Sequence, residues 1–318
     1  MSIEGSKVVV TGGAGFIGSN LVENLTQLGC SVIVIDDMSK GQLGNIRSSL
    51  DQGRVKVFRE DIREYRMIRR VTRDADYVFH AAAIIEARNP SIDESAFHDV
   101  NVTGTLNLLR ASCGSGVRRF INLSSAAVYG KSLSTPIRED SLTNPISFYG
   151  ASKLSGEHYC RVFTAVHDVE TVSLRLFNVY GPRQGYGPYA GVITGFVNRL
   201  LRNKRPIILG DGMQTRDFVH VSDVVKAMIK AATSKQNVKG KAFNVGSGKS
   251  ITIKSLARRL AEICGKDDLV PQYKPPRPGD IRHSCADVKL ASSYLGFRSA
   301  VPLDKGLEDY VSLVDGKD

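Results

Sequence analysis

The fold of this chain is decided by the stretch Val8-Val9-Val10-Thr11-Gly12-Gly13-Ala14-Gly15-Phe16-Ile17-Gly18-Ser19-Asn20. Its apolar start predicts a short buried strand, and its glycines predict a turn into a helix that continues to about Leu28. The spacing Gly13-x-Gly15-x-x-Gly18 fits a dinucleotide-binding loop, because glycines allow a tight turn, close approach to a pyrophosphate and close helix–strand packing. The free amides at the helix start, helped by the helix dipole, then face the phosphates.

A carboxylate in the right place supports this interpretation, since a glycine-rich loop alone often marks only a turn. The next apolar run, residues 31–35, ends in Asp36-Asp37. About 20 residues after the glycines, a carboxylate hydrogen-bonds the adenosine ribose in such folds. Asp36 would repel the 2′-phosphate of NADP, and Asp37 adds to that repulsion, whereas Lys40 is a nearby cation that weakens it. We therefore expect NAD as the cofactor.

Strand-like and helical patterns alternate through the first half of the chain. Apolar strand-like runs follow at residues 55–58, 77–80, 120–123 and 171–174, and helical spacing fits residues 64–71, 92–111 and 149–167. This alternation predicts an α/β fold with a doubly wound parallel sheet, covered by helices on both faces. Asp61 and Ile62 follow one of these strands, where an adenine ring can be contacted, although a helix-entry aspartate explains Asp61 equally well.

The regular alternation of strand-like and helical patterns ends after Leu176. Residues 180–188 are rich in glycine and proline and predict a loop. Beyond them we expect a helix near 192–203, a strand at 207–209, a turn at 210–212, a helix capped by Thr252 and closed by Gly265, and two short helices after Val288. We therefore expect a Rossmann-type NAD-binding lobe over residues 1–176 and a smaller mixed α/β substrate lobe over residues 177–318, with the chain crossing between them.

The composition is that of an ordinary globular protein, with 42% hydrophobic and 24% charged residues among 318. No apolar run approaches the roughly 20 residues needed to span a bilayer, and no signal-peptide pattern is present, so no membrane association is expected. The five cysteines are scattered, which indicates reduced thiols in a cytoplasmic protein rather than disulfides. Neither the cysteines nor the six histidines have metal-ligand spacing, so we expect no metal.

The formal charge of +11 raises the question of a nucleic-acid partner. The basic residues are dispersed and no run of them is interleaved with aromatics, so nucleic acid is not the expected partner. The pairs Arg69-Arg70, Arg118-Arg119 and Arg258-Arg259 are interpreted as solvated faces of surface elements. Other arginines can face an anionic ligand, and the overall charge would steer such a ligand toward the protein.

A phenol, an ammonium and a hydroxyl suggest the chemistry. Tyr149 and Lys153 are four residues apart and therefore share one helix face. A tyrosine with a pKa of about 10 is a poor base at neutral pH. An adjacent lysine cation and an oxidised nicotinamide would both lower that pKa, although a surface pair has the same spacing. Ser124-Ser125 ends the strand at 120–123, at the carboxyl edge where ligands bind in such sheets.

Six motifs now occur in the order that is typical of one family: Gly12-Gly13-x-Gly15-Phe16-Ile17-Gly18, His80-Ala81-Ala82-Ala83, Ser124-Ser125-Ala126-Ala127-Val128-Tyr129-Gly130, Tyr149-x-x-x-Lys153, Arg216-Asp217-Phe218-Val219-His220-Val221 and Arg277-Pro278-Gly279-Asp280. The chain resembles the extended short-chain dehydrogenase/reductases almost from end to end. Within them it is most similar to the nucleotide-sugar 4-epimerases, which act on UDP-glucose and its N-acetylhexosamine relatives.

The resemblance implies a bound NAD and three catalytic residues. Tyr149 is similar to the family's base, Lys153 to the residue that lowers its pKa and holds the nicotinamide ribose, and Ser125 to the hydroxyl partner of the sugar oxygen. The positions that match the family's cofactor contacts are Gly12, Gly15, Phe16, Ile17, Asp36, Asp61, Ile62, Ala81, Ala82, Asn101, Tyr149 and Lys153.

The resemblance also implies a UDP-sugar substrate. Asn178 looks like a contact to the sugar nucleotide, and Asp280 like a ligand of the uridine ribose. Arg216 and Arg277 look like the guanidiniums that meet the diphosphate, which suits the fork of arginine; on sequence alone, each would more often be a surface residue or an ion-pair partner. Ser284 matches the position that gates the pocket around the sugar C2 substituent, and a serine leaves room for an acetamido group.

The resemblance points to one reaction among those of the superfamily. The sugar dehydratases carry Asp-Glu after the active-site hydroxyl and the decarboxylases a glutamate, but here Ala126 and Ala127 cannot transfer a proton. The expected reaction is therefore reversible C4 epimerisation of UDP-hexoses through a 4-keto intermediate. Two alternatives remain, an NAD(P)H-dependent nucleotide-sugar reductase and a nucleic-acid-binding protein on the same fold. A homodimer with a two-helix interface would be typical of the family.

Overall fold

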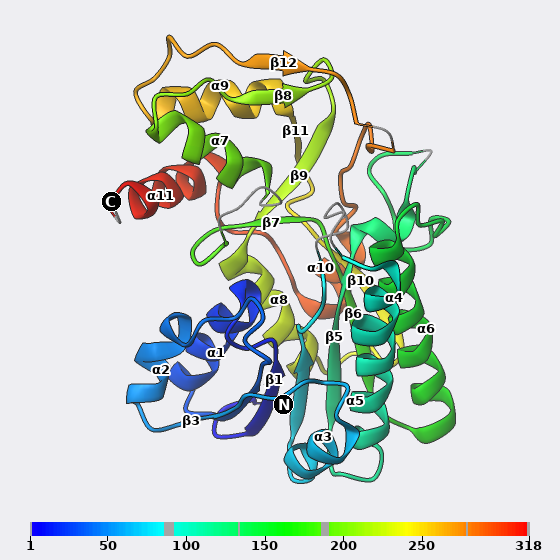
Figure 1. The fold of residues 1–318 in the computed structure, drawn as a ribbon. Helices are drawn as coiled ribbons and strands as arrows, with labels where there is room; N and C mark the ends of the chain where they lie inside the picture. The colour runs from blue at the N-terminus through cyan, green and yellow to red at the C-terminus, as the bar shows by residue number, and fades with distance from the viewer. Residues whose placement is uncertain (1, 86–91, 133, 186–190, 278, 317–318) are drawn as a thin grey trace.

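A parallel sheet of seven strands forms the centre of the computed structural model, which describes residues 2–85, 92–132, 134–185, 191–277 and 279–316 (Figure 1). The strand order is β10-β6-β5-β4-β1-β2-β3, so the order reverses beside β1. The bounds are β1 (Lys7–Thr11), β2 (Ser31–Ile35), β3 (Val55–Phe58), β4 (Tyr77–His80), β5 (Arg119–Ser125), β6 (Thr171–Leu176) and β10 (Lys241–Val245). A nucleotide binds at the carboxyl edge of such a sheet, next to the reversal.

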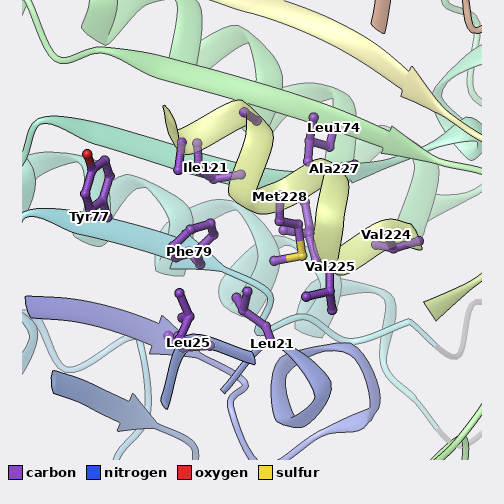
Figure 2. Close-up of a cluster of buried hydrophobic side chains, with 14 of the residues drawn as sticks. Leu21, Leu25, Tyr77, Phe79, Ile121, Leu174, Val224, Val225, Ala227 and Met228 are labelled. Carbon is purple, nitrogen blue, oxygen red and sulfur yellow. The ribbon is translucent and has the colours of Figure 1, made fainter. Parts of the chain in front are cut away.

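Helices cover both faces of this sheet because its strands are apolar on both sides. Successive strand residues face opposite ways, so Val8 and Phe79 pack on one face while Val9 and Val78 pack on the other. The first face is covered by α1 (Phe16–Gln27), α2 (Arg47–Asp51), α8 (Val221–Thr233) and α10 (Lys289–Leu295), the second by α3 (Tyr65–Thr72), α5 (Gly104–Ser112) and α6 (Phe148–His167). Figure 2 shows Met228 and Ala227 of α8 in the first cluster.

Two smaller sheets lie beyond the carboxyl edge (Figure 1). One has the order β11-β9-β7, formed by β7 (Asn178–Tyr180), β9 (Thr215–His220) and β11 (Ser250–Thr252); the other pairs β8 (Ile207–Leu209) with β12 (Gln272–Lys274). A second core joins them to α7 (Val192–Leu201), α9 (Ile253–Ile263) and α11 (Leu303–Asp315). Thr252 caps α9 by accepting the Ser255 amide, as expected.

The chain crosses between the two parts more than once. After β7 and α7 have been built into the smaller part, α8 and β10 return to the large sheet, where β10 pairs with β6. A boundary at residue 177 therefore does not coincide with the division between the two packed cores. As a domain boundary it stays a prediction.

Two sequence expectations differ from the structure. The helix expected over 92–111 consists of α4 (Glu94–Ala96), a wider π-helical segment, η2 (Phe97–Thr103), and α5. The two helix types differ in their backbone hydrogen bonds, which the apolar spacing of the sequence does not reveal. Arg119, expected on a solvated face, is 4% exposed, whereas Arg118 beside it is exposed and pairs with Asp76.

Short helical pieces complete the chain: η1 (Leu43–Ile46) and η3 (Ala126–Tyr129) precede α2 and α6 respectively. None of the described helices combines the length and the apolar character that crossing a membrane requires. Within the described ranges, no group of three metal-ligating side chains comes together. All five cysteines are free thiols.

Candidate active site

The glycine loop leaves β1 where the strand order reverses, and its geometry requires glycine at two positions. Gly12 has φ +66°, and a Cβ there would lie 2.7 Å from the backbone nitrogen of Ala82. A Cβ on Gly18 would lie 2.0 Å from the Gly12 oxygen, so α1 could not pack this closely against the loop. Gly15 precedes α1 and offers no side-chain cap, which leaves the first-turn amides of Phe16 and Ile17 to a ligand.

Asp36 lies at the carboxyl end of β2 beside this loop. Its carboxylate is buried and accepts the amides of Ala14 and Met38, both at 2.9 Å. Burial raises the pKa of Asp36, while these two hydrogen bonds lower it and Asp37 raises it further. The loop and the carboxylate thus fit a dinucleotide whose adenosine ribose carries free hydroxyls, because a 2′-phosphate would meet a buried anion.

The other expected cofactor positions are distributed around the same edge. Ala81 and Ala82 follow β4 and are bonded to Thr11, through its carbonyl and its hydroxyl respectively. Asn101, in the π-helical segment, donates to the Ile84 carbonyl and to the Ser152 hydroxyl and accepts the Ile84 amide. Asn101 therefore ties the segment after β4 to α6.

Asp61 and Ile62 follow β3 on the same side of the sheet. Ile62 is buried against Gly104. The Asp61 carboxylate pairs with Arg63 at 2.6 Å, and this guanidinium lowers the pKa of Asp61.

Ser125, Tyr149 and Lys153 come together as the sequence predicts. Ser125 ends β5 and its side chain is hydrogen-bonded to the Tyr149 phenol and accepts the Ala127 amide at 3.2 Å. Tyr149 is the second residue of α6. Lys153 follows one helical turn later, and its side chain is buried. The three side chains therefore meet at the carboxyl edge, where β5 faces α6.

The electrostatics of this group differ from the sequence expectation in one respect. Burial raises the pKa of Tyr149, and the protein group that lowers it is the Ser125 hydroxyl rather than the Lys153 ammonium. Burial lowers the pKa of Lys153 to about 8, and Glu157 and Cys160 oppose that shift. At neutral pH Lys153 is therefore still mostly a cation.

The expected substrate residues gather just beyond this edge, around β9. Ser125 pairs with Leu176, two residues before Asn178 at the start of β7, and β7 pairs with β9. Arg216 of β9 forms an ion pair with Asp280 at 3.0 Å. Ser284, 7% exposed, follows His283, which bridges to the first residue of β9.

Arg277 is the exception among the expected substrate residues. Its side chain is exposed on the strand-free segment after β12, and its carbonyl accepts the Asp280 amide at 3.3 Å. The structure thus brings Asn178, Arg216, Asp280 and Ser284 around one strand and places Arg277 beside them along the chain.

His80, which the sequence places in one of the six motifs without a role, is a buried histidine at this edge. His80 is hydrogen-bonded to the hydroxyls of Thr11 and Thr105, each at 2.8 Å, and so ties β4 to β1 and α5. Burial, with a contribution from Lys153, lowers the pKa of His80 to about 3. Its position at the end of an apolar strand, directly before three alanines, was the available signal.

The fold and this edge define an α/β enzyme that uses a dinucleotide, with a hydroxyl, a phenol and an ammonium at the carboxyl end of the sheet. Residues 8–246 match the NAD dependent epimerase/dehydratase family. The chain is 36% identical to the UDP-glucose 4-epimerase of Mycolicibacterium smegmatis over 98% of this chain and 99% of that one.

Solved structures give the same result. A UDP-glucose 4-epimerase of Thermotoga maritima with UDP-glucose superimposes with a TM-score of 0.91 at 37% identity, over 98% of this chain and 99% of that one. A UDP-N-acetylglucosamine 4-epimerase of Methanobrevibacter ruminantium, in complex with UDP-N-acetylmuramic acid, has a TM-score of 0.93 at 33% identity, over 99% and 100%. The chain belongs to the NAD dependent epimerase/dehydratase family; it is an enzyme and its cofactor is NAD.

Proposed function

We propose that this enzyme interconverts UDP-hexoses that differ in configuration at C4, through a 4-keto intermediate. The observation that carries the proposal is the Ser125–Tyr149 hydrogen bond at the carboxyl edge of the sheet, beside the NAD-binding loop and one helical turn from Lys153. The names of the relatives support the same activity. Bound NAD would supply reversible hydride transfer at C4, with no net oxidation of the sugar.

The side chains of this chain supply positioning and proton transfer. Tyr149 takes the C4 hydroxyl proton when C4 is oxidised, and it returns a proton to the C4 oxygen when the ketone is reduced. Ser125 holds the C4 oxygen and lowers the pKa of the Tyr149 phenol, and Lys153 holds the nicotinamide ribose. The 4-keto sugar turns over about its diphosphate link, which Arg216 and Arg277 hold, with Asn178 on the nucleotide and Asp280 on the uridine ribose.

Two alanines limit the reaction to this redox cycle. Ala126 and Ala127 begin the short helix η3 directly after Ser125. Neither side chain can give or accept a proton, so the site has no acid–base pair there for eliminating water or for assisting decarboxylation. Reversible oxidation at one carbon remains.

Incubation of the purified enzyme with single UDP-sugars, without added cofactor, tests this proposal. The expected products are C4 epimers, formed over many turnovers by copurified NAD. A reductase would instead require stoichiometric NAD(P)H and give a reduced sugar, and a nucleic-acid-binding protein would give no conversion. Direct titration should also show tighter binding of NAD than of NADP, because Asp36 is a buried carboxylate.

We further propose that N-acetylated UDP-hexoses are accepted beside UDP-glucose and UDP-galactose. Ser284 has a small side chain at the position that matches the family's gate, and a relative is named for UDP-N-acetylglucosamine. Ser284→Tyr should abolish turnover of the N-acetylated pair and spare the other. Since Ser284 is buried, a thermal melt must accompany the assay. If a folded Ser284→Tyr variant turned over both substrate pairs equally slowly, Ser284 would not be the gate for the C2 substituent.

We also propose a homodimer in the cytoplasm. Tyr159, Val162 and Val166 are exposed at helical spacing on α6, and a second copy of this helix would cover them. Free cysteines fit a reducing compartment. Sedimentation of Val162→Glu against the native chain tests the interface; a native monomer would refute it. The charge of +11 then serves to steer the anionic substrate.

A further inference from the structure

A buried ion pair lies directly under the Ser125 turn. Glu157 of α6 and Arg175 of β6 are 8% and 7% exposed. The Arg175 Nη2 donates to Glu157 Oε2 at 2.8 Å and its Nε donates to Oε1 at 3.0 Å. Removing two charges from water costs about as much free energy as their attraction returns, so such a pair is weak grounds for a purely stabilising role.

The hydrogen bonds of this pair hold both ends of the turn that carries Ser125. Before the turn, the Ser124 hydroxyl donates to Glu157 Oε1 at 2.5 Å. After it, Arg175 Nη1 donates to the Tyr129 hydroxyl at 2.9 Å. Ser125 and the first three residues of η3 lie between these two anchors. One ion pair therefore fixes the entrance and the exit of the turn.

Strand register places these groups in one row. Ser124 of β5 pairs with Arg175 of β6, which pairs with Asn244 of β10. The Tyr129 hydroxyl donates to Asn244 Oδ1 at 2.7 Å, and the Asn244 amide donates to Glu139 Oε1 at 2.8 Å. With its members bonded to one another, such a buried network is rigid.

The same helix carries the phenol and the carboxylate. Glu157 follows Tyr149 by two turns and Lys153 by one turn on α6. The helix therefore presents the phenol to Ser125 and, through Glu157, holds the residue before Ser125. Any shift of β5 relative to α6 would have to break the Ser124–Glu157 bond before it could separate the serine from the tyrosine.

We infer that Glu157 and Arg175 are positioning residues, which hold the turn at residues 124–129 so that the Ser125 hydroxyl stays within hydrogen-bonding reach of the Tyr149 phenol. The inference rests on the proposed function, in which these two side chains act on the sugar C4 oxygen. Neither Glu157 nor Arg175 needs to touch the substrate.

Two variants remove one anchor each and leave the ion pair intact. Ser124→Ala loses the bond to Glu157, and Tyr129→Phe loses the hydroxyl while its ring stays beneath the Arg175 guanidinium, 4.9 Å away. Each should lower kcat by about 10-fold without changing KM for the UDP-sugar or the NAD content, because a misplaced catalytic group costs rate rather than binding. Ser124→Thr keeps a hydroxyl and should restore most of kcat.

A double-mutant cycle separates positioning from a general structural effect. In a Ser125→Ala background the turn has no hydroxyl left to position, so Ser124→Ala should cause little further loss of kcat. If the fold-loss of kcat in the double variant equals the product of the two single losses, the inference is overturned. A normal kcat in both Ser124→Ala and Tyr129→Phe would also overturn it.

A matched control comes from the amino end of β5, opposite the end that carries Ser125. Glu170→Gln removes the carboxylate partner of buried Arg119 and should lower thermal stability while leaving kcat unchanged. The proposed function fails separately: it is refuted if Tyr149→Phe keeps near-normal turnover. An inactive Tyr149→Phe together with a fully active Ser124→Ala refutes the positioning role alone.

Discussion

An arginine–glutamate ion pair lies beside each end of strand β5, and the two pairs bind different kinds of group. Both side chains are buried in the Arg175–Glu157 pair, whereas Glu170 in the other pair is partly exposed. At the amino end, Arg119 pairs with Glu170 at 2.7 Å and donates to the carbonyls of Ala231, Ala232 and Ser234 at the end of α8. At the carboxyl end, the Arg175–Glu157 pair binds the hydroxyls of the Ser125 turn. The first pair satisfies backbone groups at a helix end, and the second holds side chains beside the site.

This difference separates stability from chemistry along a single strand. The Arg119 guanidinium completes the hydrogen bonding of a helix end, which is needed in any protein that packs a helix on a sheet. The carboxyl edge, in contrast, collects buried titratable groups such as Asp36, His80 and Lys153, whose burial is costly and is tolerated where function requires it. Substitutions at the two edges should therefore affect different measured quantities.

The largest expected contrast is between two tyrosines. Tyr149→Phe removes the proposed base and should reduce kcat by about 10²- to 10⁴-fold, with the fold and NAD content retained. Tyr77 lies at the amino end of β4, and among the described residues its buried hydroxyl has no hydrogen-bond partner (Figure 2). Tyr77→Phe should keep full activity and leave stability equal or slightly raised. Steady-state kinetics and thermal melts of both variants check the contrast.

Next in size is the stability cost of breaking the two ion pairs. Glu157→Gln leaves a buried Arg175 without its anion and should lower the free energy of unfolding by about 3–5 kcal/mol. Glu170→Gln should cost less, because Glu170 is partly exposed and Arg119 keeps three carbonyl partners. Urea unfolding measures both. Equal costs would show that the two pairs are energetically equivalent.

A smaller effect is expected away from β5, at the proposed diphosphate site. Arg277→Ala should raise KM for the UDP-sugar by an amount equivalent to about 1.5–3 kcal/mol, the range for a lost charge-assisted hydrogen bond. NAD content and stability should stay unchanged, because the Arg277 side chain is exposed. Arg258→Ala, at an exposed ion pair on α9, is the control. An unaltered KM would place Arg277 outside the binding site.

The smallest effect concerns pH. His80 has a folded-state pKa of about 3 against an ordinary value of 6.5, so below pH 6.5 the unfolded chain binds a proton that the folded chain does not. Stability should therefore fall as pH drops below about 6.5, by at most about 1.4 kcal/mol per pH unit from this group, and be unaffected by it above. His80→Gln should flatten this part of the curve in urea titrations between pH 7.5 and 5.5. A slope that the substitution leaves intact belongs to other groups.

The strands and the NAD loop were predictable because they depend on local sequence. Parallel strands buried on both faces are continuous apolar runs, so 31–35, 55–58 and 77–80 stand out and match β2, β3 and β4. The loop is predictable because the glycines and Asp36 are needed at fixed spacing. The family, the fold class and the cofactor are confirmed; the roles of the individual site residues stay predictions.

Partners distant in the sequence were not predictable. Glu157 meets Ser124 and Arg175, 33 and 18 residues away, only because β5 and β6 pair in a particular register. Arg119 was misassigned because Arg118-Arg119 was treated as one surface pair, whereas Arg118 precedes β5 and Arg119 is the first residue of that strand, which is buried on both faces. The π-helical segment at Asn101 likewise leaves no trace in the apolar spacing.

The position of β10 and α8 has a consequence for synthesis of the chain on the ribosome. Leu21, Phe79 and Ile121 belong to parts of the chain made early, yet Val225 and Met228 of α8 cover them (Figure 2). The sheet is also completed by β10, which pairs with β6. This apolar face of the sheet therefore stays exposed until about residue 245 has left the ribosome. During this interval the nascent chain needs protection from aggregation.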